Sequence, residues 1–221
     1  MIAALLGGSL WMWAAAGDPL AALPPPAAGA VRVYVVRHGQ ALMNLSPPPK
    51  LSPDGLDHLT DLGREQARAA GHTLAGHGVT LVLSSPARRA RETSAEIRAA
   101  LGRPSLRVEP DLRPMEQGRS STGMGRDPTP SGGESREQVG RRVLAVAARL
   151  ARRGHRGAVV FVAHSEVIGA FLGQVQGRPG AASDPPAVRN GSISVVDVPA
   201  AGPPRVLLTD HVPEPVPAAA R

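Results

Sequence analysis

The pattern of apolar and polar positions divides the chain into short apolar runs and longer amphipathic stretches. Three runs, at residues 31–36, 79–83 and 158–163, are continuous and do not alternate with polar residues. Continuous runs of this length are typical of strands buried on both faces, as in a parallel sheet. They predict three central parallel strands, and the runs at 192–198 and 206–212 predict two later strands.

Helix-start signals lie between the predicted strands. Thr60 precedes one stretch of helical periodicity, Ser85 with Pro86 forms an N-cap and first-turn pair before a second, and Ser135 with Gln138 forms a capping box before a third. Strands that alternate with helices connect by right-handed crossovers and bury both faces of the sheet. We therefore expect an α/β fold, a three-layer sandwich with a mostly parallel central sheet and helices on both faces.

The two ends of the chain differ in composition from the part between them. Residues 2–16 form an apolar run of signal-peptide length with no Lys or Arg before it, and a Pro-rich stretch follows. We expect residues 1–30 to be a signal peptide or a hydrophobic, Pro-rich extension, 31–212 one domain, and 213–221 a disordered tail. This organisation favours export to the periplasm or outside the cell, with a cytoplasmic location as the alternative and no other stable membrane span.

Composition narrows the possible chemistry. The chain of 221 residues has no cysteine, which excludes disulfides, thiolate catalysis and Cys-ligated zinc. Its formal net charge of +7 favours anionic ligands through long-range attraction. Aromatic residues make up only 2% of the chain, which argues against a surface that stacks nucleic-acid bases. We expect no nucleic-acid partner.

The chemically informative residues follow the three predicted central strands. The first strand runs into Arg37-His38-Gly39, the second into Ser84-Ser85-Pro86 with Arg88 and Arg89 behind it, and the third into His164-Ser165. The carboxyl ends of parallel strands meet at one edge of the sheet, where ligands of such folds bind. These three ends carry basic groups and no acidic one, so they repel one another unless an anion is present. We expect a small phosphorylated substrate.

Four segments in a fixed order carry a family resemblance. They are Arg-His-Gly at 37–39, Asn44, the run SSPARRARET at 84–93, and Ala-His at 163–164. This ordered set resembles the histidine phosphatase, or phosphoglycerate-mutase-like, superfamily over residues 31–198. The resemblance implies that His38 is a nucleophile, that Arg37 and Arg89 clamp the phosphate, that His164 makes a second phosphate contact, and that Asn44 adds a hydrogen bond.

The chemistry of these side chains agrees with those roles. A neutral imidazole can attack phosphorus when an acceptor holds its other nitrogen, and a backbone carbonyl near Gly39 could be that acceptor. A guanidinium grips two phosphate oxygens and stays charged. Removing one such donor typically costs about 3 to 4 kcal/mol of transition-state stabilisation. No metal or other cofactor is implied, because the histidines have no carboxylate partners nearby in sequence.

The chain departs from the family pattern where a general acid is expected. The family usually has a Glu two residues after a Leu, whereas here Pro114 follows Leu112 at that spacing. Glu116 is the first candidate for the acid and Glu166 the second. Asp54 and Glu134 stay open, and an activated leaving group or a phosphohistidine substrate would need no acid.

A second departure follows the second histidine, where the family often has Gly and this chain has Ser165. Such a serine can cap the next helix and still point its amide at a phosphate. The sequence therefore predicts a phosphomonoester hydrolase that works through a phosphohistidine. A non-catalytic phosphate-binding module and a mutase-type phosphotransferase are the alternatives. Residues 116–134 are expected to form a loop over the site.

Overall fold

A six-stranded sheet forms the centre of the molecule. The structure is a computed structural model that describes residues 18–116, 133–178 and 188–215. The strand order is β3-β2-β4-β1-β5-β6. The strands are β1 (Ala30–Arg37), β2 (Val79–Ser84), β3 (Ser105–Val108), β4 (Ala158–Ala163), β5 (Ile193–Pro199) and β6 (Arg205–His211). The first four are parallel, and β5 is antiparallel to both of its neighbours.

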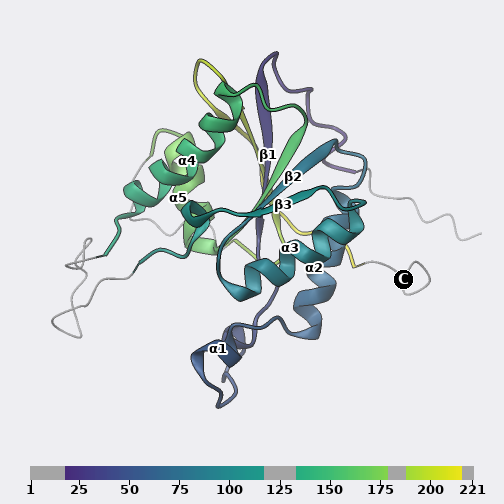
Figure 1. Ribbon diagram of the computed structural model, residues 1–221, viewed down its shortest axis with the longest axis vertical. Helices are drawn as coiled ribbons and strands as arrows, with labels where there is room; N and C mark the ends of the chain where they lie inside the picture. Colours follow the sequence, from purple (N-terminus) through teal and green to yellow (C-terminus); the bar gives the residue numbers. More distant parts are fainter. Residues whose placement is uncertain (1–17, 117–132, 179–187, 216–221) are drawn as a thin grey trace, which may run out of the picture.

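Helices cover both faces of the sheet, with α2 and α3 on one side and α4 and α5 on the other (Figure 1). The helices are α1 (Pro53–Leu56), α2 (Asp61–Thr73), α3 (Arg88–Ala100), α4 (Arg136–Arg152) and α5 (Ser165–Val175), with 3-10 turns at Leu42–Asn44 and Pro110–Leu112. The predicted three-layer α/β fold is confirmed. The pattern missed β3 and the three short helical segments, since four residues or fewer carry little periodicity.

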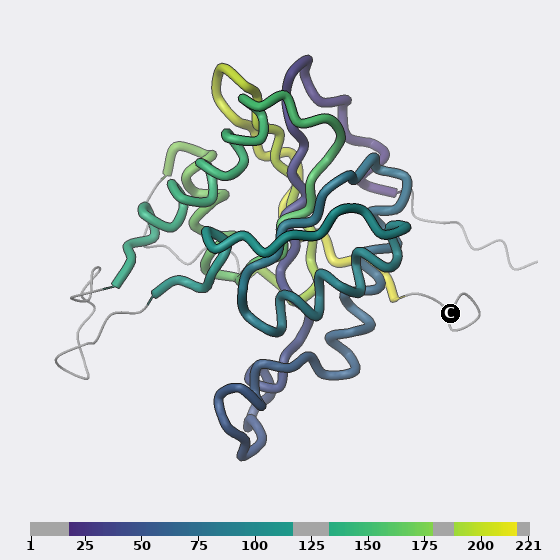
Figure 2. Tube along the Cα trace, viewed as in Figure 1, coloured from purple at the N-terminus to yellow at the C-terminus, as the bar shows by residue number. Residues whose placement is uncertain are grey.

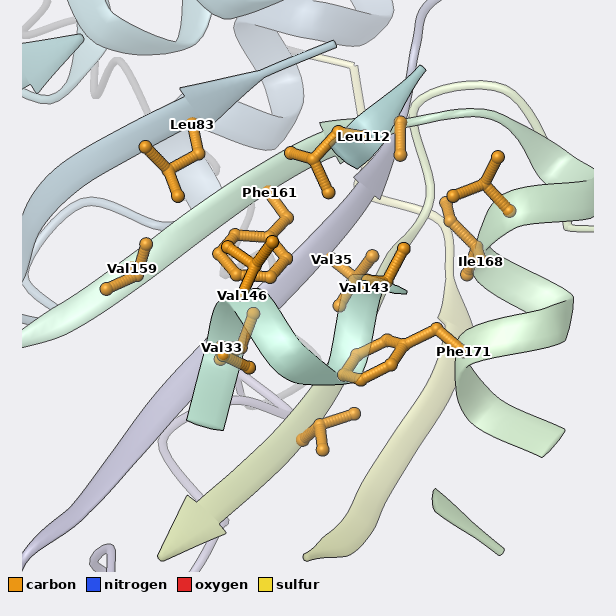
Figure 3. Close-up of a cluster of buried hydrophobic side chains, with 14 of the residues drawn as sticks. Val33, Val35, Leu83, Leu112, Val143, Val146, Val159, Phe161, Ile168 and Phe171 are labelled. Carbon is orange, nitrogen blue, oxygen red and sulfur yellow. The ribbon is translucent and has the colours of Figure 1, made fainter. Parts of the chain in front are cut away.

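The apolar residues of the central strands divide into two cores. In β1, Val33 and Val35 face α4 and α5, whereas Tyr34 and Val36 face α2 and α3. Figure 3 shows the first core, in which Phe161 and Phe171 are the largest labelled side chains. All six residues of β4 are buried. Burial on both faces explains why these strands read as continuous apolar runs.

Two of the three predicted helix starts are confirmed. The Thr60 hydroxyl accepts a hydrogen bond from Gly63 N at 3.0 Å, and Ser135 closes a capping box with Gln138. The prediction for Ser85 and Pro86 is wrong, because α3 begins at Arg88 with Ala87 as its N-cap. The Ser85 hydroxyl, which the local sequence predicted to cap α3, instead forms a tertiary contact with His164.

The folded unit begins before residue 31, where we expected it to start. Leu20 is buried in the core beneath α2 and α3, Asp18 pairs with His77, and the carbonyl of Pro24 accepts a hydrogen bond from Arg32. In Figure 2 this purple segment turns at the top of the view and then descends as β1. Residues 2–16, for which a signal or anchor is predicted, lie outside the described residues. So does most of the predicted loop at 116–134.

Candidate active site

The three basic strand ends meet as predicted. Immediately after β1, His38 N donates a hydrogen bond to Ala163 O at 3.0 Å, and Ser85 N, after β2, donates to Val162 O at 2.9 Å. The ends of β1, β2 and β4 are therefore locked together through backbone hydrogen bonds. The rings of His38 and His164 lie with their centroids 5.2 Å apart.

His38 is buried and held as one tautomer. Its Nδ1–H donates to the carbonyl of Gly39 at 2.8 Å, which leaves Nε2 as the nitrogen that carries the lone pair. Burial, together with repulsion from Arg89 and Arg37, lowers the pKa of His38 to about 3, against the opposing effects of the Gly39 carbonyl and the Asp57 charge. The imidazole is thus neutral at physiological pH, as a nucleophile requires.

Arg89 connects the two histidines. Its Nε–H donates to His38 Nε2 at 3.1 Å, and its Nη2–H donates to His164 Nδ1 at 3.0 Å. Its Nη1 forms an ion pair with Asp57. One planar guanidinium therefore bridges both imidazoles and a carboxylate, which fixes its orientation.

His164 takes the opposite tautomer from His38. Because its Nδ1 accepts from Arg89, its Nε2 carries the proton and donates to the Ser85 hydroxyl at 2.8 Å. Burial lowers the pKa of His164 well below its usual value, and the nearby His38 and Arg89 act in the same direction. Both histidines are neutral between permanent cations.

Arg37 has a buried donor that no described residue satisfies. Its Nη1 donates to the carbonyl of Val188, but its Nε is buried and has no hydrogen-bond partner among residues 18–116, 133–178 and 188–215. Burial lowers the pKa of Arg37, and the charge of Glu166 partly offsets that effect. An unpaired buried donor beside a neutral nucleophile is a position that an anion's oxygen can fill.

The remaining predicted phosphate contacts differ from one another. Asn44 is exposed, and its side-chain oxygen accepts a hydrogen bond from Ala41 N at 2.9 Å, which closes a 3-10 turn. No described contact joins it to His38 or Arg89, so its role stays a prediction. Ser165 is the first residue of α5 and His164 is the N-cap, so Ser165 does not cap this helix. Its backbone N–H belongs to the unpaired first turn, beside His164.

The first candidate acid, Glu116, points to solvent. Its side chain is 60% exposed and pairs with Arg113. Glu134 also pairs with Arg113 and forms a two-pronged contact with Arg142. Hydrogen bonds and charge from these arginines lower the pKa of Glu134 below its ordinary value despite the opposing effect of burial. A carboxylate stabilised in its ionised form is a poor proton donor.

The other open candidates are Asp54 and Glu166. Asp54 is exposed and pairs with Arg88 on the outer side of α3. Glu166 lies in the first turn of α5, two residues after His164, and its charge acts on Arg37. Of the four candidate carboxylates, Glu166 is the one whose electrostatic partner is a predicted phosphate clamp.

The structure adds three residues to which the sequence assigned no role. Asp57 pairs with Arg89. The site therefore contains an acidic group, whereas the strand ends had predicted none. Thr93 accepts from Gly39 N at 3.0 Å, and Asn190 donates to His38 O at 2.9 Å. Thr93 stood in the motif at 84–93, whereas Asp57 and Asn190 had no local signal.

Taken together, these groups define a class of protein. A neutral imidazole, with its Nε2 lone pair directed toward Arg89, lies among two guanidinium groups, a second imidazole and the N-terminus of a helix, at the carboxyl edge of a parallel sheet. Fixed cations around a buried nucleophile suit a tetrahedral oxyanion that the nucleophile can attack. This is the arrangement of an α/β protein that handles phosphate esters.

Comparison with known proteins identifies the family. The chain belongs to the histidine phosphatase superfamily (branch 1), which matches residues 33–211. It is 26% identical over 185 residues to a Yersinia pestis protein described as "Probable phosphoglycerate mutase GpmB", with 76% of this chain and 85% of the relative covered. Phosphatase or mutase activity is therefore plausible on family grounds alone.

Solved structures agree with this assignment. A mycobacterial glucosyl-3-phosphoglycerate phosphatase superimposes with a TM-score of 0.65 at 26% identity, covering 82% of this chain and 99% of that one. The Bacillus stearothermophilus protein YhfR gives a TM-score of 0.68 at 23% identity, covering 82% and 98%, which shows the shared fold. Within the described ranges, no helix is long and apolar enough to cross a membrane.

Proposed function

We propose that the protein is a phosphomonoester hydrolase that forms a covalent phosphohistidine on His38. The observation that supports this most directly is the tautomer of His38. Because Nδ1–H is tied to the Gly39 carbonyl, the lone pair of Nε2 faces Arg89 and His164, where a phosphoryl group would be held. The expectation of a small phosphorylated substrate belongs to this proposal.

The reaction would proceed in two displacements. The His38 Nε2 lone pair forms a bond to phosphorus while the bond from phosphorus to the leaving oxygen breaks, and that oxygen takes up a proton. Water then attacks phosphorus, the N–P bond breaks, and inorganic phosphate leaves. Arg37 and Arg89 would neutralise the charge on the transferring group in both steps.

For the proton donor, we favour Glu166 over Glu116. Glu166 lies in the first turn of the helix that follows His164 and interacts electrostatically with Arg37. Glu116 is exposed and paired with Arg113. A general acid must lie within hydrogen-bond reach of the leaving oxygen, and Glu166 lies two residues after His164, the predicted second phosphate contact.

The covalent intermediate gives the first test. Purified protein should hydrolyse a generic aryl phosphate, and enzyme quenched with denaturant during turnover should carry phosphate that is labile to acid and stable to base. His38→Ala should abolish both signals, because no nucleophile replaces the imidazole. Arg91→Met, a change at an exposed position of α3, is the matched control and should retain both. Hydrolysis at an unchanged rate by His38→Ala would refute the proposal.

The proton donor gives the second test. Glu166→Gln should slow hydrolysis of an alkyl phosphate by about a hundredfold or more, but hydrolysis of a nitrophenyl phosphate far less, because only the poor leaving group needs the proton. Glu116→Gln should leave both rates near those of the wild type. If Glu116→Gln shows the selective loss and Glu166→Gln does not, the assignment is reversed.

Two other functions make different predictions. A non-catalytic phosphate-binding module would be thermally protected by phosphate yet carry no trapped phosphohistidine. A mutase-type phosphotransferase would move the trapped phosphate to a second hydroxyl of the substrate faster than to water. Quenching in the presence of 3-phosphoglycerate, followed by separation of its isomers and free phosphate, distinguishes all three.

A further inference from the structure

Asp57 belongs to the hydrogen-bond network around Arg89 and has no role in the mechanism described so far. Arg89 makes three side-chain contacts, of which two are with neutral imidazoles and one, through Nη1, is with the Asp57 carboxylate. The carboxylate is the only charged partner among the three. Ion-paired hydrogen bonds are stronger than those to neutral acceptors, so Asp57 dominates the placement of the guanidinium.

Asp57 is itself fixed to α3. Its Oδ2 accepts a hydrogen bond from Arg88 N at 2.8 Å while Oδ1 holds Arg89. The next two residues are tied to the same helix through Glu92, which accepts from His58 Nδ1 at 2.8 Å and from Leu59 N at 3.0 Å. The carboxylate therefore cannot follow Arg89 if that side chain turns.

The contact between Arg89 and His38 must change during the reaction. Arg89 Nε–H donates to His38 Nε2, and therefore occupies the lone pair that has to attack phosphorus. When a phosphoryl group enters, Nε–H and Nη2–H have to turn from the imidazole nitrogens to phosphate oxygens. The Nη1 contact with Asp57 is on the opposite branch of the fork and can persist.

We propose that Asp57 is a positioning residue. It holds Nη1 of the Arg89 guanidinium in place while Nε–H and Nη2–H change their acceptors, from the imidazoles of His38 and His164 to oxygens of the transferring phosphoryl group. This inference rests on the proposed function. Asp57 takes no part in bond making. The N–P bond forms at His38, the P–O bond breaks, and the proton on the leaving oxygen comes from elsewhere.

The charge of Asp57 gives the proposal a distinctive signature. A carboxylate close to the site repels a phosphate dianion, so its removal does not weaken phosphate binding in the ground state. Loss of the fixed Arg89 geometry, by contrast, slows the chemical step, because a displacement of about 1 Å in a positioned group can cost on the order of a hundredfold in rate. Turnover and phosphate affinity should therefore separate in an Asp57 variant.

The experiment compares Asp57→Asn and Asp57→Ala with the wild type in kcat for an aryl phosphate and in Kd for inorganic phosphate by calorimetry. We expect kcat to fall by about tenfold in Asp57→Asn and about a hundredfold in Asp57→Ala. We expect Kd for phosphate to be unchanged or lower in both. The amide of Asn keeps an acceptor for Arg89 Nη1, and for this reason it should retain more activity than Ala.

The matched control is Glu96→Gln. Glu96 lies on α3, the helix to which Asp57 is bound. Like Asp57 it pairs with an arginine, Arg68, and its side chain is 22% exposed against 18% for Asp57. Because this pair lies away from the histidines, both kcat and Kd should be retained. This variant controls for the loss of an ion pair on α3.

Two outcomes overturn the inference: wild-type kcat in Asp57→Ala, or a parallel loss of kcat, phosphate affinity and thermal stability, which would show a purely structural role. Failure of the proposed function is visible separately, as a wild-type protein that neither hydrolyses the ester nor traps phosphate. In that case weaker phosphate binding by Asp57→Asn would still refute the placement of Asp57.

Discussion

At the residue scale, the site depends on keeping two imidazoles neutral beside permanent cations. His38 and His164 are buried, and each has one nitrogen that accepts a hydrogen bond from Arg89. Protonation of either ring would convert that acceptor into a donor facing a guanidinium. The arrangement that keeps the nucleophile neutral therefore also disfavours protonation of both histidines in the native state.

Because protonation of these histidines is disfavoured in the native state, the stability of the protein should depend on pH. Below the ordinary histidine pKa of 6.5, the unfolded chain binds protons that native His38 and His164 do not, so the free energy of unfolding should decrease as pH falls. For His38, whose native pKa is about 3, this loss should amount to roughly 2 kcal/mol between pH 6.5 and 5, and His164 should contribute in the same direction.

The measurement is urea unfolding at pH 6.5 and pH 5 for the wild type and for His38→Gln. The variant should lose about 2 kcal/mol less stability over that interval than the wild type, because one of the two groups is gone. His72→Gln, a change near the C-terminal end of α2 and away from the site, should behave like the wild type. Equal losses in the wild type and His38→Gln would contradict the assignment of His38 as a neutral buried group.

At the element scale, the position of the nucleophile depends on the close approach of the first turn of α2 to the chain after β1. A Cβ at Gly39 would lie 2.1 Å from Gly63 O, and a Cβ at Gly63 would lie 2.1 Å from Gln40 O. Both distances are far below any allowed contact, and the atoms met are backbone atoms. The two glycines therefore let α2 pack directly beneath His38.

Gly63→Ala tests this contact. The added methyl should displace α2 from the chain at residues 39–40 and lower stability by about 1 to 3 kcal/mol, despite the gain of up to about 1 kcal/mol in helix propensity. The displacement should also lower kcat, since the Gly39 carbonyl orients His38. Gly55→Ala in α1 is the control, because its Cβ would lie 3.2 Å from the Leu51 Cβ. Equal stability of the two variants would exclude a tight contact at Gly63.

At the scale of the whole molecule, the sheet brings together groups that are distant in the chain. His38, Arg89 and His164 lie after β1, after β2 and after β4, and the order of these strands places them side by side. The sheet is rigid because both faces are packed with aliphatic side chains. The formal charge of +7 adds a long-range attraction that draws anions toward these fixed donors.

Phosphate should accordingly stabilise the entire fold. At a concentration about 100 times its Kd, inorganic phosphate should add about 2.7 kcal/mol, or roughly 5 to 10 °C in Tm for a domain of this size. Arg37→Met should lose most of this shift, because it removes the buried donor that has no partner in the described part of the chain. Arg91→Met should keep it. An equal shift in all three proteins would indicate a nonspecific salt effect on Tm.

Much of the fold could be predicted because its signals are local. Residues 158–163 are apolar at every position, residues 31–36 and 79–83 are apolar at all positions but Arg32 and Thr80, and Thr60 and Ser135 bond to N–H groups three residues away. The ends of the strands also follow from the local pattern. Once the strands are taken as parallel, the geometry of the sheet requires His38 and His164 to share one edge. The acceptor for His38 Nδ1 was predictable for the same reason, because Gly39 is the next residue.

The remaining features of the site depend on packing between distant segments. Asp57 reaches Arg89 across 32 positions, and Asn190 reaches the His38 carbonyl across 152. Ser85 contacts His164 across 79 positions instead of capping its own helix. By itself, the sequence determined which groups stand at the strand ends, because strand and cap signals act over a few residues. Only the tertiary structure decided which partners orient those groups, because hydrogen bonds and ion pairs act through space, and the separation in sequence places no limit on them once the sheet has formed.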